Sequence, residues 1–254
     1  MKQLYIIGIG PGSPEYLSPA AHKALESCTD LVGHGLYLNL LGELTDGKTR
    51  HKTPMGEELA RATVALDLAA NGQTTALVSS GDAGIYGMAT VVFELLARKP
   101  KPEWEAVAIE VLPGISAMQA VAARVGAPLA HDFCVISLSD LLTPWELILK
   151  RIDLAGQGDF AVALYNAVSH KRSWQLIAAR DTLLRYRKPD TPVIVAFNVT
   201  RKGEQLNLMT LAELDPEPLN MLSLVLVGNS ETRRTGQWIY TPRGYHTKPE
   251  LADT

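Results

Sequence analysis

Three short glycine-containing segments each follow an apolar run, and each is a candidate for binding a ligand. They are Gly8-Ile9-Gly10-Pro11-Gly12, Ser80-Gly81-Asp82 and Pro113-Gly114-Ile115-Ser116-Ala117. Such a segment can offer backbone N–H groups to a phosphate, or it can turn the chain where a side chain would not fit. Alternatively, the glycines of any one segment only allow the chain to make a tight turn. This alternative explains less well why several successive apolar runs are each followed by such a segment.

The first segment does not fit a dinucleotide-binding fingerprint. Ser13 stands at the third glycine position of G-x-G-x-x-G counted from Gly8, and Pro11 and Pro14 remove backbone donors. Gly33-His34 ends the next apolar run, with no acidic residue placed to take a ribose. No G-x-x-x-x-G-K-[ST] sequence occurs. We interpret the segment as a rigid turn, poor in donors, past which a bulky ligand can lie.

Strand-like and helix-like segments alternate along the chain, which predicts an α/β fold with helices packed on mostly parallel strands. We expect an N-terminal domain over residues 1–113 and a C-terminal domain over residues 114–254, the second more mixed. Strands are predicted over residues 4–9, 31–32, 75–78, 107–112, 133–138, 160–164, 193–197 and 222–227. Helices are predicted over residues 19–26, 57–70, 87–98, 115–125, 144–152 and 173–184. In such sheets ligands bind on the loops after the strands, where the three segments lie.

Composition excludes several classes of protein. Hydrophobic residues make up 46% and charged residues 20% of 254 residues, as in ordinary globular enzymes. A net charge of −3 argues against a generally nucleic-acid-binding surface. The two cysteines, Cys28 and Cys134, form no metal-binding pattern, so we expect no metal. No apolar run reaches the ~20 residues that span a bilayer, and we expect a cytoplasmic protein without a membrane partner.

The three segments, taken in order, resemble the N-terminal signatures of the tetrapyrrole methylases. These are S-adenosylmethionine-dependent enzymes of cobalamin and sirohaem synthesis. Later segments are similar to the branch of this family that methylates C17 of precorrin-3B, and the resemblance covers essentially residues 3–245. The later segments are residues 131–133, 136–145, 164–166, 227–230 and 241–245.

The resemblance implies the fold, the reaction and the partners. The fold would be two α/β domains of the tetrapyrrole methylase type, with the active-site cleft between them, in a homodimer. The reaction would be methyl transfer from S-adenosylmethionine to C17 of precorrin-3B with ring contraction to precorrin-4, leaving S-adenosylhomocysteine. A sulfonium cofactor carries no phosphate, which agrees with a donor-poor first segment.

The resemblance also implies which residues bind the cofactor. Gly81, Asp82 and Ala83 would contact its methionine end, largely through backbone, and Tyr165 and Asn166 would lie near its adenosine. The full set is Pro11 (beside the substrate cleft), Gly81, Asp82, Ala83, Ser116, Ala117, Tyr165 and Asn166, with Asn198 a weaker candidate.

Proton transfer during ring contraction needs a titratable group, and Asp82 is the expected one. Its alternative role is to cap the turn that follows it. His34, Lys52 and Glu57 are further candidates, each equally readable as a surface or turn residue. Substrate carboxylates would meet one or two of the basic groups, which are residues 50–52, 171–172, 201–202 and 233–234.

The sequence departs from the family pattern at a few positions. Ala83 stands where proline is common, Ala167 lacks the frequent proline after Asn166, and His34 replaces the more usual tyrosine. The loops should survive these changes. Several functions stay open: the cobalt-loaded substrate of the anaerobic route (cobalt-factor III), another precorrin methylase, a non-catalytic tetrapyrrole carrier, and a dinucleotide oxidoreductase.

Overall fold

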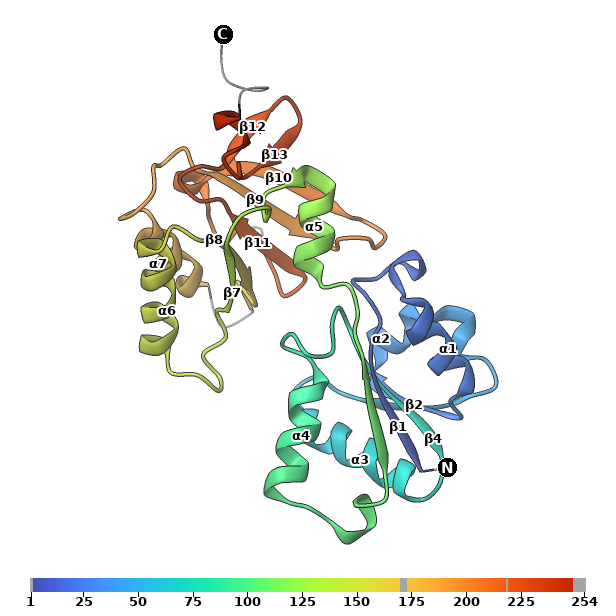
Figure 1. Ribbon diagram of the computed structural model, residues 1–254. Coiled ribbons are helices and arrows are strands. Elements are labelled where there is room, and N and C mark those ends of the chain that lie inside the picture. Colours follow the sequence, from blue (N-terminus) through green and yellow to red (C-terminus); the bar gives the residue numbers. More distant parts are fainter. Residues whose placement is uncertain (1, 170–172, 218, 249–254) are drawn as a thin grey trace. The chain divides into compact units, whose positions relative to one another are not determined.

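The computed structural model describes residues 2–169, 173–217 and 219–248, and the chain forms two compact units, Met1–Ala117 and Met118–Thr254 (Figure 1). The division therefore follows Ala117, whereas the sequence predicts it after Pro113. Both units are α/β, each with its own five-stranded sheet.

The sheet of the first unit is entirely parallel. Its strands are β3 (Thr49–Thr53), β2 (Asp30–His34), β4 (Thr74–Ser79), β1 (Gln3–Gly8) and β5 (Ala108–Leu112), in that spatial order. β1 pairs with β4 from Gln3 opposite Thr74 to Gly8 opposite Ser79. Because all five strands run the same way, every loop that follows a strand emerges at one edge.

Helices cover both faces of this sheet, which is why β1 is a continuous apolar run instead of an alternating one. Leu4 and Ile6 pack with α3 (Glu58–Ala70) and α4 (Met88–Arg98), while Ile7 packs on the other face. That face is covered by α1 (Pro19–Ser27) and α2 (Gly35–Leu40) (Figure 1). The Ser18 hydroxyl caps α1 by accepting the Ala21 N–H at 3.2 Å, as its position before Pro19 predicts.

The sheet of the second unit is mixed. Its strands are β10 (Gln205–Thr210), β9 (Pro192–Phe197), β11 (Ser223–Val227), β8 (Ala161–Tyr165) and β7 (Phe133–Ser137), in that order. β7, β8 and β9 run one way and β10 and β11 the other. The unit's helices are α5 (Ala117–Val125), α6 (Trp145–Gln157) and α7 (Trp174–Leu183). α6 and α7 bury their apolar sides together with β8, β9 and β11 in one core.

Smaller elements complete the chain. A three-stranded sheet has the order β12 (Arg233–Thr235), β13 (Trp238–Tyr240) and β6 (Gly126–Ala127). The 3₁₀ turns are η1 (Pro14–Tyr16), η2 (Gly42–Thr45), η3 (Pro102–Trp104), η4 (Leu211–Glu213) and η5 (Tyr245–Thr247). No helix in the described part of the chain is both long and apolar enough to cross a membrane.

The sequence predicts every long helix and every central strand, within a few residues at the ends. It misses the short helix α2, the edge strands β3 and β10 and the small sheet of β12, β13 and β6, and it ends α6 five residues early. β3 reads Thr-Arg-His-Lys-Thr and buries no residue fully, so it has no apolar run to detect.

Candidate active site

The three glycine segments meet at one edge of the first unit's sheet. They follow β1, β4 and β5, which are neighbours in the order β4-β1-β5. The structure thus brings these three loops together within the first unit. The edge is the place where parallel α/β sheets bind ligands.

The loops after β1 and β4 are joined through their backbones. Gly10 and Gly81 form an isolated antiparallel bridge, with the Gly81 N–H donating to the Gly10 carbonyl at 2.8 Å and the reverse bond at 3.1 Å. Both residues have positive φ, 77° and 67°, a conformation that glycine adopts without strain. Their donors are therefore used to hold the loops together, not to bind a phosphate.

The Asp82 carboxylate joins the loop after β4 to the loop after β5. Its Oδ1 accepts the N–H of Gly84 at 2.8 Å, within its own loop. Its Oδ2 accepts the N–H of Gly114 at 2.9 Å, across the sheet edge. Both oxygens are thus engaged by backbone donors, and this geometry favours a positioning role for Asp82. A proton-transfer role stays a prediction.

Two glycines of these loops stand where no side chain fits. A Cβ on Gly114 would lie 2.2 Å from the Gly81 carbonyl oxygen and 2.6 Å from that of Gly8. A Cβ on Gly8 would lie 2.7 Å from both the Gly114 nitrogen and the Gly81 oxygen. The glycines therefore let three backbones pack against one another at the sheet edge.

The other predicted cofactor residues of this unit offer mainly backbone. Ala83 is fully buried in the core, Ser116 is buried, and Pro11 is buried in the loop before η1. The Ala83 carbonyl accepts the Ala89 N–H at 3.0 Å and so sets the start of α4. A ligand lying here would meet peptide groups and few side chains, as the resemblance implies for Gly81, while Ala83 has no exposed surface.

The second unit brings its own predicted residues to one edge of its sheet, where β7, β8 and β9 end. Tyr165 ends β8, and its hydroxyl accepts the N–H of Met118 in α5 at 3.0 Å. Asn166 has a φ of +52° and donates from Nδ2 to the Ser137 hydroxyl at 2.9 Å. Asn198, with a φ of +50°, follows β9 at the same edge. Left-handed asparagines after strands are a feature of functional loops.

The loop after Asn198 is held by Glu204. One carboxylate oxygen accepts the Thr200 N–H at 2.8 Å, and the other accepts the Arg124 Nε–H at 2.8 Å. The hydrogen bond from Arg124, followed by that from Thr200, keeps the pKa of Glu204 below its ordinary value. The carboxylate therefore stabilises the loop at neutral pH.

We expect Glu204→Gln to lower the free energy of unfolding by about 1 kcal/mol at pH 7. A depressed pKa gives stability that is present above the unfolded pKa and lost as pH falls through the folded one. The difference between wild type and E204Q should therefore shrink as the pH falls below the ordinary glutamate pKa of about 4.3, and vanish only below the lowered pKa of Glu204 in the folded protein. Urea unfolding at several pH values measures it. Glu231→Gln, which removes only an exposed pair with Arg233, is the control, and an equal loss in both would contradict the account.

The sequence does not distinguish Arg61 from a surface residue, yet in the structure it organises the same edge of the first unit. It is 3% exposed, and it donates to the Thr53 hydroxyl at 2.6 Å, the Pro54 carbonyl at 2.7 Å and the Met88 sulfur at 3.4 Å. It thereby ties the segment after β3 to the start of α4. Its spacing four residues before the buried Ala65 was the available signal.

The further acid–base candidates belong to other elements than the loops of the Asp82 junction. His34 ends β2, and its Nδ1 accepts the Leu36 N–H at 3.3 Å, capping α2. Lys52 lies in β3, and Glu57 precedes α3. This arrangement gives His34 a structural task.

The basic groups divide by position. Residues 50–52 lie within β3, the outermost strand of the first sheet, where Arg50 donates to Asn39 and His51 bonds Asp30 at 2.8 Å. Residues 201–202 follow β9, at the edge of the second sheet that holds Asn166 and Asn198. Arg233 and Arg234 are in β12, where Arg233 bonds the Ser230 carbonyl at 2.8 Å and Arg234 that of Gly236 at 3.1 Å. Residues 171–172 lie outside the described residues. Among the basic groups with described positions, this placement favours residues 201–202 for contact with a ligand.

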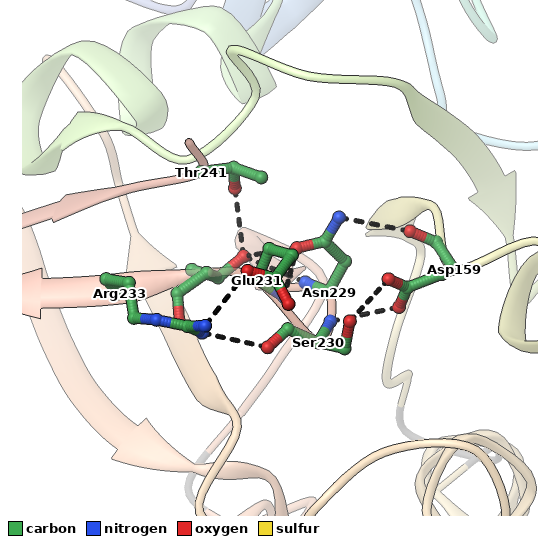
Figure 2. A network of polar contacts seen from close by, with 7 residues as sticks. Asp159, Asn229, Ser230, Glu231, Arg233 and Thr241 are labelled. Atoms are coloured by element: carbon green, nitrogen blue, oxygen red, sulfur yellow. Dashed lines mark hydrogen bonds and ion pairs between the residues drawn. The ribbon is translucent and has the colours of Figure 1, made fainter. Parts of the chain in front are cut away.

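Two of the later sequence segments form a polar network at the other edge of the second sheet (Figure 2). The Asp159 carboxylate accepts the N–H of Ser230 at 2.9 Å and its hydroxyl at 2.6 Å, while the Asp159 carbonyl accepts the Asn229 amide at 3.1 Å. Thr241 donates to the Pro128 carbonyl at 2.7 Å. These segments fix the ends of β8, β11 and β13 and have a structural role.

Buried Arg187 supports that network from within. It bonds the Gly228 carbonyl at 2.8 Å and the Phe160 carbonyl, so one guanidinium holds the end of β11 to the start of β8. Burial lowers the pKa of Arg187, although a guanidinium stays charged at neutral pH.

The α/β fold with three glycine loops joined at one edge of the sheet is characteristic of one class of proteins. Comparison of the sequence with known families identifies that class. Residues 3–215 match the sequence model of the Tetrapyrrole (Corrin/Porphyrin) Methylases. The chain belongs to this family.

Within this family, the chain is similar to proteins named as C17-methyltransferases. The chain is 45% identical to a probable cobalt-factor III C(17)-methyltransferase of Salmonella typhimurium, covering 95% of this chain and 99% of the relative. It is 42% identical to a precorrin-3B C(17)-methyltransferase of a Sinorhizobium species, covering 95% and 96%. A crystal structure of the methyltransferase CobJ matches with a TM-score of 0.89 and 41% identity over 94% of this chain and 99% of that one.

Other curated relatives are longer. The chain spans about half of several, for example 47% of the cobalt-factor III methyltransferase of Priestia megaterium, to which it is 43% identical over 99% of its own length.

Proposed function

We propose that this chain transfers a methyl group from S-adenosylmethionine to C17 of precorrin-3B, with ring contraction to precorrin-4, in cobalamin biosynthesis. The observation that carries the proposal is the identity of 42% to 45% with two C(17)-methyltransferases over nearly the whole of each chain. The joined glycine loops support it, because they supply a backbone surface at the sheet edge where the family's cofactor residues fall.

The chemistry of the cofactor suits this surface. A sulfonium with an amino-acid head group carries no phosphate, so it does not need the N–H groups that Gly10, Gly81 and Gly114 already use within the junction. We propose that the cofactor lies against the loops formed by Pro11, Gly81, Asp82, Ala83, Ser116 and Ala117, and that Tyr165 and Asn166 contact its adenosine.

Methylation of an electron-rich macrocycle needs alignment more than activation of a nucleophile. Orientation alone supplies effective molarities of ~10⁵ M or more. The residues that fix the loops, Asp82 and Arg61, thus contribute by holding the binding surface in one geometry. Excluding water protects the intermediates of ring contraction.

A second candidate substrate is cobalt-factor III, the cobalt-loaded counterpart. It is favoured by the name of the Salmonella relative at 45% identity, just as precorrin-3B is favoured by that of the Sinorhizobium relative. Both assignments share the reaction at C17.

The experiment is to incubate the protein with labelled S-adenosylmethionine and either substrate, and to analyse the product by mass spectrometry and NMR. We expect one added methyl group at C17 and a contracted ring. Transfer to another carbon would replace the proposal with a different precorrin methylase. Tight tetrapyrrole binding without transfer would favour a carrier. The homodimer and the cytoplasmic location belong to the same proposal, and light scattering tests the first.

A further inference from the structure

Two consecutive leucines project from the loop between β7 and α6. Leu141 is 80% exposed and Leu142 is 98% exposed. Leaving two leucines in water forgoes the free energy that their burial would give. Exposed apolar side chains grouped in this way are typical of binding sites.

The loop that carries them is anchored by hydrogen bonds at the two residues just before the leucines. Before the leucines, the Ser139 N–H donates to the Ser137 hydroxyl at 3.2 Å, and Asp140 accepts from Gln175 at 3.1 Å. Gln175 is 1% exposed, so the anchor comes from the core side of α7. The exposure of the leucines is therefore a feature of a fixed loop.

Aromatic side chains flank the same loop. Trp145 begins α6 directly after it, and Trp174 begins α7. Their rings pack edge to face, with centroids 4.9 Å apart and an interplanar angle of 71°. Trp174 is itself 50% exposed. The loop thus presents apolar groups beside a pair of tryptophans.

The loop lies at the edge of the second sheet where the candidate ligand residues are. It follows the carboxyl end of β7, and Ser137, the last residue of that strand, accepts the Asn166 amide at 2.9 Å. The same hydroxyl accepts the Ser139 N–H. One serine therefore connects the candidate adenosine contact with the base of the leucine loop.

We propose that Leu141 and Leu142 pack against the apolar face of the tetrapyrrole macrocycle and hold it at this edge. The proposal rests on the proposed function and adds the residues that position the substrate. Residues 139–145 contain no lysine or arginine and one aspartate, so this loop suits the ring and not its carboxylates.

Other occupants fit less well. A membrane-binding loop carries basic residues beside its apolar ones, and this loop carries an acidic one. Two leucines are also a small part of the ~800 Å² per partner that a stable protein interface buries. The experiment below therefore also detects binding to a membrane or to a second protein chain.

The experiment compares the wild type with Leu141→Ser/Leu142→Ser and with the control Leu154→Ser. Leu154 is 52% exposed in α6, three turns beyond the loop, and its replacement leaves the edge intact. Steady-state methyl transfer gives KM for the tetrapyrrole, and calorimetry gives the affinity for S-adenosylhomocysteine. Tryptophan fluorescence quenching by the tetrapyrrole reports binding without turnover.

We expect the double variant to raise KM and the quenching Kd for the tetrapyrrole about tenfold or more, with S-adenosylhomocysteine affinity and thermal unfolding unchanged. L154S should match the wild type. Unchanged KM and Kd in the double variant would overturn the inference. So would a double variant that loses self-association or vesicle binding shown by the wild type. If the wild type binds the tetrapyrrole but transfers no methyl group, the proposed function fails while quenching still tests the leucines.

Discussion

Replacing Gly114 with alanine is expected to destabilise the first unit by ~3 kcal/mol and to abolish measurable binding of S-adenosylhomocysteine. The added Cβ would lie 2.2 Å from the Gly81 oxygen and 2.6 Å from the Gly8 oxygen, and both are backbone atoms. Neither can move aside as a flexible side chain can, so the loop after β5 must shift away. Overpacking of this kind costs ~1–3 kcal/mol or more.

The shift would also lengthen the hydrogen bond from Gly114 to Asp82, now 2.9 Å, and so release the loop after β4. Thermal unfolding measures the first effect and calorimetry the second. Gly35→Ala is the matched control, because its Cβ would meet only the Lys52 Cδ at 3.8 Å and because alanine favours the helix that begins there. A G114A protein with wild-type stability and affinity would show that the junction is not needed for the cofactor.

The sequence predicts the parts of this junction but not the junction itself. Each loop is visible because glycine and proline interrupt a local apolar run, and strand periodicity is a local property. The bond from Gly114 to Asp82 spans 32 residues and depends on the strand order β4-β1-β5. No local pattern contains that order. The sequence therefore places Asp82 in a glycine loop after a strand, whereas it does not reveal which N–H groups its carboxylate accepts.

The same reasoning explains Arg61 and the later segments. A charged residue on a helix is ordinarily predicted to be exposed to solvent. The structure shows instead that Arg61 is buried between Thr53, Pro54 and Met88. Residues 227–230 and 241–245 mark the family in sequence, but their visible task is to hold strand ends. Family-specific residues can thus serve the fold as well as the reaction.

The first glycine segment now has a physical explanation. Its prolines lack the N–H donors that a phosphate site needs. Its glycines contact the neighbouring loops, Gly8 by close packing and Gly10 by the bridge to Gly81. The motif builds a platform from three backbones. A ligand is then bound by the groups that this platform leaves exposed.

Replacing Asp82 is the second large effect we expect. Asp82→Ala leaves the N–H groups of Gly84 and Gly114 without their acceptor, and each lost bond to a charged group costs about 1.5–3 kcal/mol. Asp82→Asn is expected to be nearly as damaging, because its amide presents a donor to one of two N–H groups. Both variants should weaken binding of S-adenosylhomocysteine at least tenfold, by the relation of about 1.4 kcal/mol per tenfold. Asp132→Asn, at an exposed carboxylate, should leave the affinity unchanged.

The pH profile separates a positioning role from proton transfer. If Asp82 holds the loops, the residual kcat of D82N at saturating cofactor keeps the wild-type pH dependence, because the titrating groups of the reaction are untouched. If Asp82 moves a proton, affinity stays near the wild-type value while kcat falls about 10²–10⁴-fold and one limb of the profile disappears. The two bonds to backbone donors lead us to expect the first outcome. A carboxylate that already accepts from Gly84 and Gly114 has its geometry fixed by the loops, and it fixes theirs in return.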